Sequence, residues 1–129
     1  MVNKNAVTLL ELMVVIIIIV ILVTISLLSF GSSKENIHTK EAVYNLKLLQ
    51  AAERSYKVDM GTFYPSSGTI SVVDTINDNL GLSLPTSSSR IWNYSVKDTG
   101  CVQATRNGAD GRSRYLAATS LDPSTGTCP

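Results

Sequence analysis

The side chains that most often do catalysis are sparse in this chain. Its single histidine, His38, lies far in the sequence from any plausible nucleophile pocket, so we expect a solvated surface side chain and not a catalytic base. No serine-nucleophile, zinc-protease, phosphate-binding or dinucleotide-binding motif occurs in the 129 residues. The sequence therefore predicts a protein that is not an enzyme and that needs no cofactor.

Three arginines, Arg106, Arg112 and Arg114, gather around a turn-rich connection near the C-terminus. Phosphate contacts depend on local cations, so one interpretation is a contact with nucleic acid. The alternative, which we favour, is a solvated turn. The whole chain carries 11 Lys plus Arg against 10 Asp plus Glu, and this balance argues against binding driven by net charge.

The only cysteines, Cys101 and Cys128, both lie in the C-terminal part of the chain. Their wide spacing, without a CxxC motif, gives no redox or zinc signature, and two free thiols in a cytosolic domain are one interpretation. The other is a disulfide, which needs an oxidising compartment and would stabilise the domain by roughly 3.5 kcal/mol. We expect the disulfide, and therefore a globular part outside the inner membrane.

Glu11 is the acid with the most unusual position, because an unbroken apolar run from Leu12 to Val23 follows it. The segment from Val7 to Phe30 is long enough to cross a hydrocarbon core of about 30 Å as a helix. Each Leu, Ile or Val favours insertion by roughly 0.3–0.6 kcal/mol, whereas a charge at the bilayer centre costs about 2.5–3.5 kcal/mol. The summed free energy therefore favours insertion. Glu11 either extends its carboxylate to the lipid headgroups or pairs with a positive group from another subunit.

The stretch Ala6–Val15, which reads AVTLLELMVV, resembles the leader-cleavage motif of type IV pilins and type II secretion pseudopilins. In that family a short basic leader is cut before the apolar helix, and an acid occupies the fifth position of the mature chain. The resemblance implies that a prepilin peptidase cuts between Ala6 and Val7, that Val7 is N-methylated, and that Glu11 acts in assembly. It also implies that the precursor lies in the inner membrane. After cleavage the subunits would assemble with one another into a helical homopolymer, which forms an extracellular or periplasmic filament.

The chain departs from the family pattern at four positions. Ala6 stands where Gly is usual, and Val7 stands where Phe or Met is usual. Many members also carry a helix-breaking Gly and Pro where this chain has Val20 and Leu28. We therefore expect the helix to stay intact between Val20 and Leu28, even after assembly.

Three aspartates, Asp98, Asp110 and Asp122, lie in predicted turns. The resemblance raises the option of a calcium site there. The chain lacks the regularly spaced acidic ligands of a known calcium loop, so we predict no bound metal.

The segment Lys34–Met60 contains strong helix formers and no proline, and it predicts a continuation of the apolar helix that ends at Gly61. The expected packing stripe consists of Ile37, Val43, Tyr44, Leu48, Ala51, Ala52 and Tyr56, widened by Leu46 and Leu49.

Shorter elements follow. Ser71–Leu80 has apolar residues at helical spacing and Gly81 as its stop, with a strand over Thr69–Asp74 as the alternative. The tail Asp122–Pro129 has no period. Alternation of bulky and polar residues predicts three strands, Ile91–Val96, Cys101–Arg106 and Ser113–Ser120.

These elements predict an α+β fold in which the second half of one long helix packs on a small antiparallel sheet. The expected organisation is a leader at 1–6, a transmembrane and assembly helix at 7–30, and a pilin-like globular domain at 31–129. The expected function is structural, as a subunit of a type IV pilus or pseudopilus. The alternative is a minor pilin that presents the arginine turn to DNA, or that acts as an adhesive module.

Overall fold

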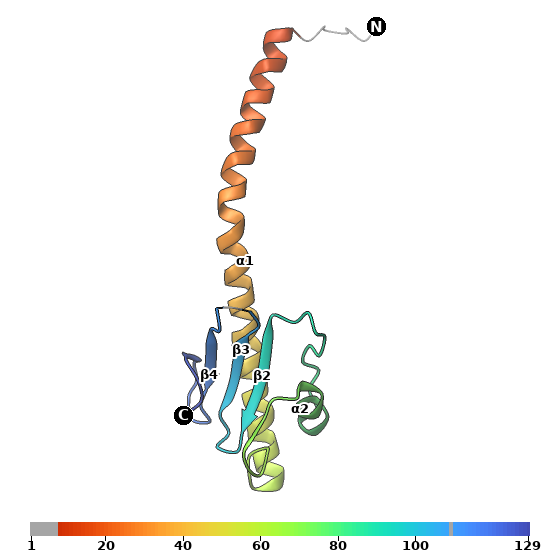
Figure 1. The fold of residues 1–129 in the computed structure, drawn as a ribbon, viewed down its shortest axis with the longest axis vertical. Helices are drawn as coiled ribbons and strands as arrows, with labels where there is room; N and C mark the ends of the chain where they lie inside the picture. The colour runs from red at the N-terminus through yellow and green to blue at the C-terminus, as the bar shows by residue number, and fades with distance from the viewer. Residues whose placement is uncertain (1–7, 109) are drawn as a thin grey trace. The chain divides into compact units, whose positions relative to one another are not determined.

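The computed structural model describes residues 8–108 and 110–129, and it shows the α+β fold that the sequence predicts (Figure 1). Within these residues, helices α1 (Leu9–Met60) and α2 (Val73–Leu80) accompany an antiparallel sheet. The strands are β1 (Thr69–Ile70), β2 (Trp92–Lys97), β3 (Val102–Arg106), β4 (Ser113–Leu116) and β5 (Ser124–Thr125).

Helix α1 is continuous from Leu9 to Met60, as the sequence predicts. It contains no proline that would delete a backbone donor. Gly61 ends it with a φ of +81°, and its N–H donates to the carbonyl of Lys57 at 2.9 Å. The chain divides into two compact units between Ile37 and His38, so each unit contains part of α1.

The second unit is built on a meander in which β1 to β5 neighbour one another in sequence order. A row of apolar pairs crosses the sheet: Ile70 pairs with Val96, Val96 with Val102, and Val102 with Leu116. Alternate residues of β2 are buried, as expected for a strand with one face on a core. The last turns of α1 lie behind β2 and β3 in Figure 1 and cover that face.

The face of α1 that packs on the sheet differs from the predicted stripe. The buried residues of this helix are Ala42, Asn45, Leu46, Leu49, Gln50 and Glu53. Leu46 and Leu49 are confirmed, but Ile37 and Tyr44 are 62% and 68% exposed. The polar members are buried because they have partners, as where the Asn45 amide donates to the Tyr94 hydroxyl at 2.7 Å.

The shorter elements are confirmed with shifted ends. Helix α2 begins at Val73, two residues later than predicted, and ends at Gly81 with a φ of +65°. The strand considered as an alternative over Thr69–Asp74 is present only at Thr69–Ile70, as β1. The third predicted strand ends at Leu116, because a turn follows in which the Ser120 N–H donates to the Ala117 carbonyl at 3.0 Å. The tail contains β5, which the sequence analysis did not predict.

Candidate functional site

The N-terminal end of α1 is capped by Thr8. Its hydroxyl oxygen accepts a hydrogen bond from the backbone N–H of Glu11 at 3.3 Å, and its carbonyl accepts one from Leu12 at 3.2 Å. Thr8 and Glu11 therefore occupy the Ncap and N3 positions of α1, and an acid in the first turn lies near the positive end of the helix dipole. The predicted cleavage pair, Ala6 and Val7, lies outside the described residues.

The helix surface beyond Glu11 is apolar all the way round. Every side chain from Leu12 to Val23 is between 46% and 60% exposed, so no face of this segment packs on the protein's own described residues. By length and composition α1 is able to cross a membrane. A surface of this kind needs lipid or other helices around it, since water would solvate it poorly.

Two hydroxyl residues just beyond this segment, Thr24 and Ser26, have hydrogen-bond acceptors for their hydroxyl groups. Thr24 donates to the carbonyl of Ile21 at 2.8 Å, and Ser26 donates to that of Leu22 at 2.9 Å. Because these bonds lie within one helix, neither hydroxyl needs a partner from outside, and both are compatible with a lipid environment.

The two cysteines form a disulfide, as expected. Cys101 is buried beside β3, and the backbone N–H of Cys128 donates to the Gln103 side chain at 3.0 Å. The Lys97 ammonium donates to the carbonyl of Pro129. The bridge and these bonds attach the tail to the centre of the sheet.

The three arginines of the predicted nucleic-acid contact do not form an uncompensated cationic patch. Asp110 lies 3.5 Å from the Arg106 guanidinium and 2.8 Å from that of Arg112. Desolvation alone would raise the pKa of Asp110, but the hydrogen bonds and charges of these arginines outweigh it and lower that pKa. Arg114 lies on β4, half-buried, opposite Ala104 and Thr125. A contact with nucleic acid stays a prediction.

The aspartates considered for calcium have separate partners. Asp98 accepts a hydrogen bond from the Gly68 N–H at 2.8 Å, and Asp122 pairs with Lys47 at 3.4 Å. Among the described residues, no three His, Cys, Asp or Glu side chains gather in a way that could hold a metal ion. The expected surface histidine, His38, is half-buried, with its ring 3.9 Å from Glu41.

Glu53 is a buried acid that the sequence analysis did not single out. Its side chain is fully buried, and one carboxylate oxygen accepts the backbone N–H of Tyr64 at 2.9 Å, while the other oxygen has no hydrogen-bond partner among the described residues. Burial raises the pKa of Glu53 from 4.5 to about 7, against the lowering effect of the Tyr64 hydrogen bond. Glu53 thus anchors the loop that follows α1.

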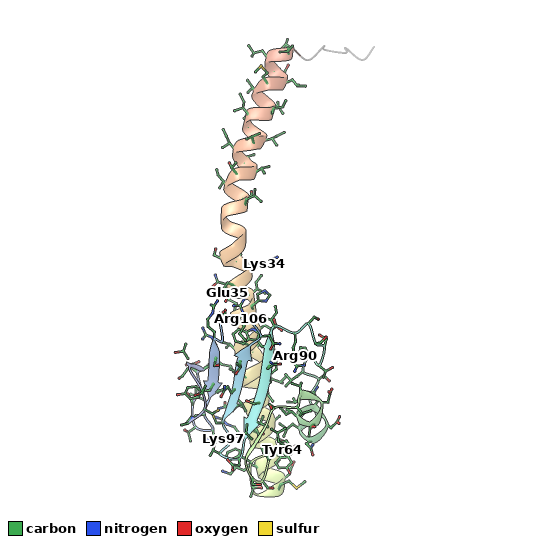
Figure 2. The ribbon with its side chains drawn as sticks, viewed as in Figure 1. Lys34, Glu35, Tyr64, Arg90, Lys97 and Arg106 are labelled. Atoms are coloured by element: carbon green, nitrogen blue, oxygen red, sulfur yellow. A yellow bond between two sulfur atoms is a disulfide. The ribbon has the colours of Figure 1, made fainter. Side chains whose placement is uncertain are left out.

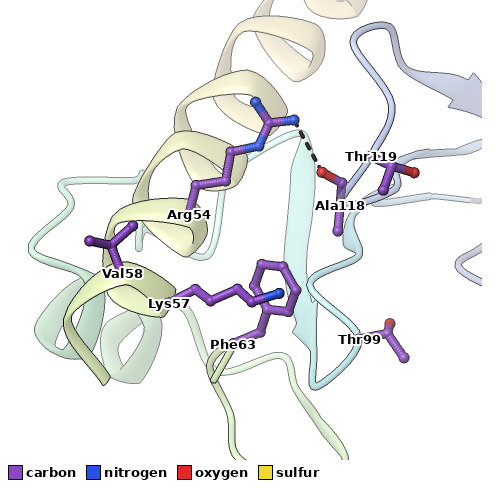
Figure 3. Close-up of a pocket in the computed structure, with 7 residues that line it drawn as sticks. All are labelled: Arg54, Lys57, Val58, Phe63, Thr99, Ala118 and Thr119. Atoms are coloured by element: carbon purple, nitrogen blue, oxygen red, sulfur yellow. Dashed lines mark hydrogen bonds between the residues drawn. The ribbon is translucent and has the colours of Figure 1, made fainter. Parts of the chain in front are cut away.

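An open groove of about 660 Å³ lies between the end of α1 and the loops beside it (Figure 3). It is lined by Arg54, Lys57, Val58, Phe63, Thr99, Ala118 and Thr119. Lys57 places its ammonium 4.1 Å from the centre of the Phe63 ring, and Arg54 donates to the Ala118 carbonyl at 3.1 Å. In Figure 2, Tyr64 and Lys97 mark this end of the sheet, whereas Arg106 marks the other.

Comparison of the chain with models of protein families, with curated proteins and with solved structures finds no match.

Proposed function

We propose that this chain is a structural subunit of a type IV pilus or pseudopilus filament. It enters the inner membrane as a precursor, is cleaved, and assembles through its apolar N-terminal helix. One observation carries the proposal: Glu11 sits in the first turn of a helix whose next twelve residues are apolar and exposed on every side. The resemblance of Ala6–Val15 to a leader-cleavage motif supports it.

The apolar surface explains how one segment serves two environments. In the membrane, lipid covers the side chains of Leu12–Val23, and in a filament the same helices of neighbouring subunits cover one another. Neither state needs a change in the segment itself, because every backbone group within the helix is already paired.

The acid explains how the helices find a register. Cleavage before Val7 creates a positive amine four residues from Glu11. Each charge is costly alone in a medium of low dielectric, but the amine of one subunit beside the Glu11 of its neighbour largely cancels both. The register of lowest free energy is the one that aligns them.

The disulfide supports a location for the globular part. A bridge between Cys101 and Cys128 persists in an oxidising compartment, which fits a domain exported across the inner membrane.

The experiment is the intact mass of the protein purified from membranes and from sheared filaments of a host that has a prepilin peptidase. We expect a chain that begins at Val7, carries one methyl group and lacks two hydrogens at the disulfide. Ala6→Leu, which replaces the small residue before the cut, should leave the leader in place as a matched control. An intact Met1 in assembled material would remove the main support for this function.

A further inference from the structure

The groove at the end of α1 carries two positive charges and no acidic lining residue. Arg54 and Lys57 lie three residues apart on one face of the helix, so their Cβ atoms are about 5–6 Å apart. Within the described residues neither forms an ion pair, although Arg54 donates to a carbonyl and Lys57 lies over a ring. Val58 adds an apolar side chain that is 85% exposed.

Helix α2 carries the complementary charges. Asp74 and Asp78 are exposed and lie four residues apart, which again separates the Cβ atoms by about 5–6 Å. The last turn of α2 has no basic residue, and neither aspartate forms an ion pair with another described residue. The two surfaces therefore match in charge and in the spacing of their charged residues.

The two surfaces are built from different segments of the domain. Helix α2 lies between β1 and β2 in the sequence and packs beside β2, whereas the groove takes Thr99 from the turn between β2 and β3 and Ala118 and Thr119 from the segment between β4 and β5. Figure 1 shows α2 on the side of β2 that faces away from β4. One copy of the domain thus presents both surfaces, and the exposed Arg54, Lys57, Asp74 and Asp78 remain open to another molecule.

From this arrangement we infer that the groove of one subunit receives the acidic face of α2 from a second copy of the chain. Arg54 and Lys57 then face Asp74 and Asp78 across the contact. A contact between two different surfaces of identical subunits is heterologous, and when it does not close into a ring it propagates as a helical filament. This inference rests on the proposed filament function and names a contact between its globular domains.

Carbodiimide cross-linking tests the contact, because it joins a lysine amine only to a carboxylate that it touches. Full-length protein labelled with ¹⁴N and ¹⁵N is mixed before assembly, so that peptides of mixed label identify links between copies. We expect mixed-label links from Lys57 to Asp74 or Asp78. Lys57→Arg lacks the reactive amine, so it should abolish the link and thereby identify Lys57 as the residue that forms it.

Charge reversal is the second test of the contact. It is made at Lys57 and Asp78, so the hydrogen bond from Arg54 to Ala118 stays in place. Lys57→Glu or Asp78→Lys alone should lower filament yield roughly tenfold, because attraction becomes repulsion. The double variant should restore it. Lys40→Glu, a reversal of an exposed lysine outside the groove, should have no effect.

The outcomes separate this contact from the proposed function. Normal filaments without a mixed-label link would overturn the contact and leave the filament function standing. A defect of Lys57→Glu that Asp78→Lys does not repair would place a different anionic partner in the groove and also overturn it. Uncleaved, unassembled wild-type protein would count against the filament function, and missing cross-links in its membranes would count against the contact as well.

Discussion

The hydroxyl of Thr8 accepts a hydrogen bond from the backbone N–H of Glu11. Glu11 therefore has a local role at the start of α1 in addition to any role between subunits. The two roles can be separated, since the cap depends on the Thr8 oxygen and the proposed intersubunit pair depends on the Glu11 charge.

Thr8→Ala should weaken the helix start by about 1 kcal/mol while filaments still form. Thr8→Ser keeps the capping oxygen and serves as the matched control. Carbonate extraction of membranes measures insertion, and the mass of sheared filaments measures assembly. If Thr8→Ala abolished filaments as completely as a change of Glu11, assembly would depend on the helix start as strongly as on the Glu11 charge.

Glu53 should make the stability of the domain depend on pH. Its pKa is raised to about 7 in the folded chain, so between pH 4.5 and 7 the folded chain holds a proton that the unfolded chain has released. Stability therefore falls as pH rises through this window, by up to about 3 kcal/mol, and is level above it. Denaturant unfolding of the full chain in detergent, repeated across pH, measures the slope.

Glu53→Gln should flatten that profile, because the amide oxygen still accepts the Tyr64 N–H but no longer titrates. Asp59→Asn removes one exposed carboxyl from the same helix as a control. An unchanged slope in Glu53→Gln would show that another group causes the pH dependence.

Gly100 should tolerate no side chain. Its φ is +75°, and an added Cβ would lie 2.7 Å from three atoms of the Phe63 ring. Gly100→Ala should cost about 1–2 kcal/mol for the backbone and a further 1–3 kcal/mol for the clash. Gly61→Ala isolates the backbone cost, since its φ is +81° with no atom within 4 Å of the Cβ. Equal losses in the two variants would mean that Phe63 moves freely.

The disulfide should be essential to the stability of the globular part. Cys101→Ala with Cys128→Ala should lower the free energy of unfolding by about 3.5 kcal/mol, because the bridge closes a long loop of the unfolded chain. Unfolding of the wild-type chain with and without reductant measures the same difference. Two free thiols in exported protein, found by mass spectrometry without reductant, would contradict both the bridge and the compartment argument.

The sequence predicts the elements that are long enough for a hydrophobic pattern to repeat. Helix α1 follows from the lack of proline before Gly61, and β2 follows from the alternation of Trp92, Tyr94 and Val96 with polar residues. Strands β1 and β5 have two residues each, which is too short for any period to appear. They exist because neighbouring strands supply the hydrogen bonds.

The buried face of α1 and the groove could not be predicted from the sequence, because both depend on contacts with residues that are distant in the chain. Asn45 and Glu53 look like solvent-facing residues in the sequence, and only the Tyr94 hydroxyl and the Tyr64 N–H explain their burial. No sequence signal marks Glu53. The Thr8–Glu11 cap did have one, since Thr-x-x-Glu before an apolar run is a capping-box pattern.

The proposed assembly depends most directly on the Glu11 charge, and filament yield of Glu11→Leu measures it. The variant should insert into membranes at least as well as the wild type, because a costly charge is removed. Electron microscopy of sheared material should then find no filaments, or filaments in poor register, since no carboxylate remains to pair with the neighbour's amine. Abundant, well-ordered filaments from Glu11→Leu would contradict the account.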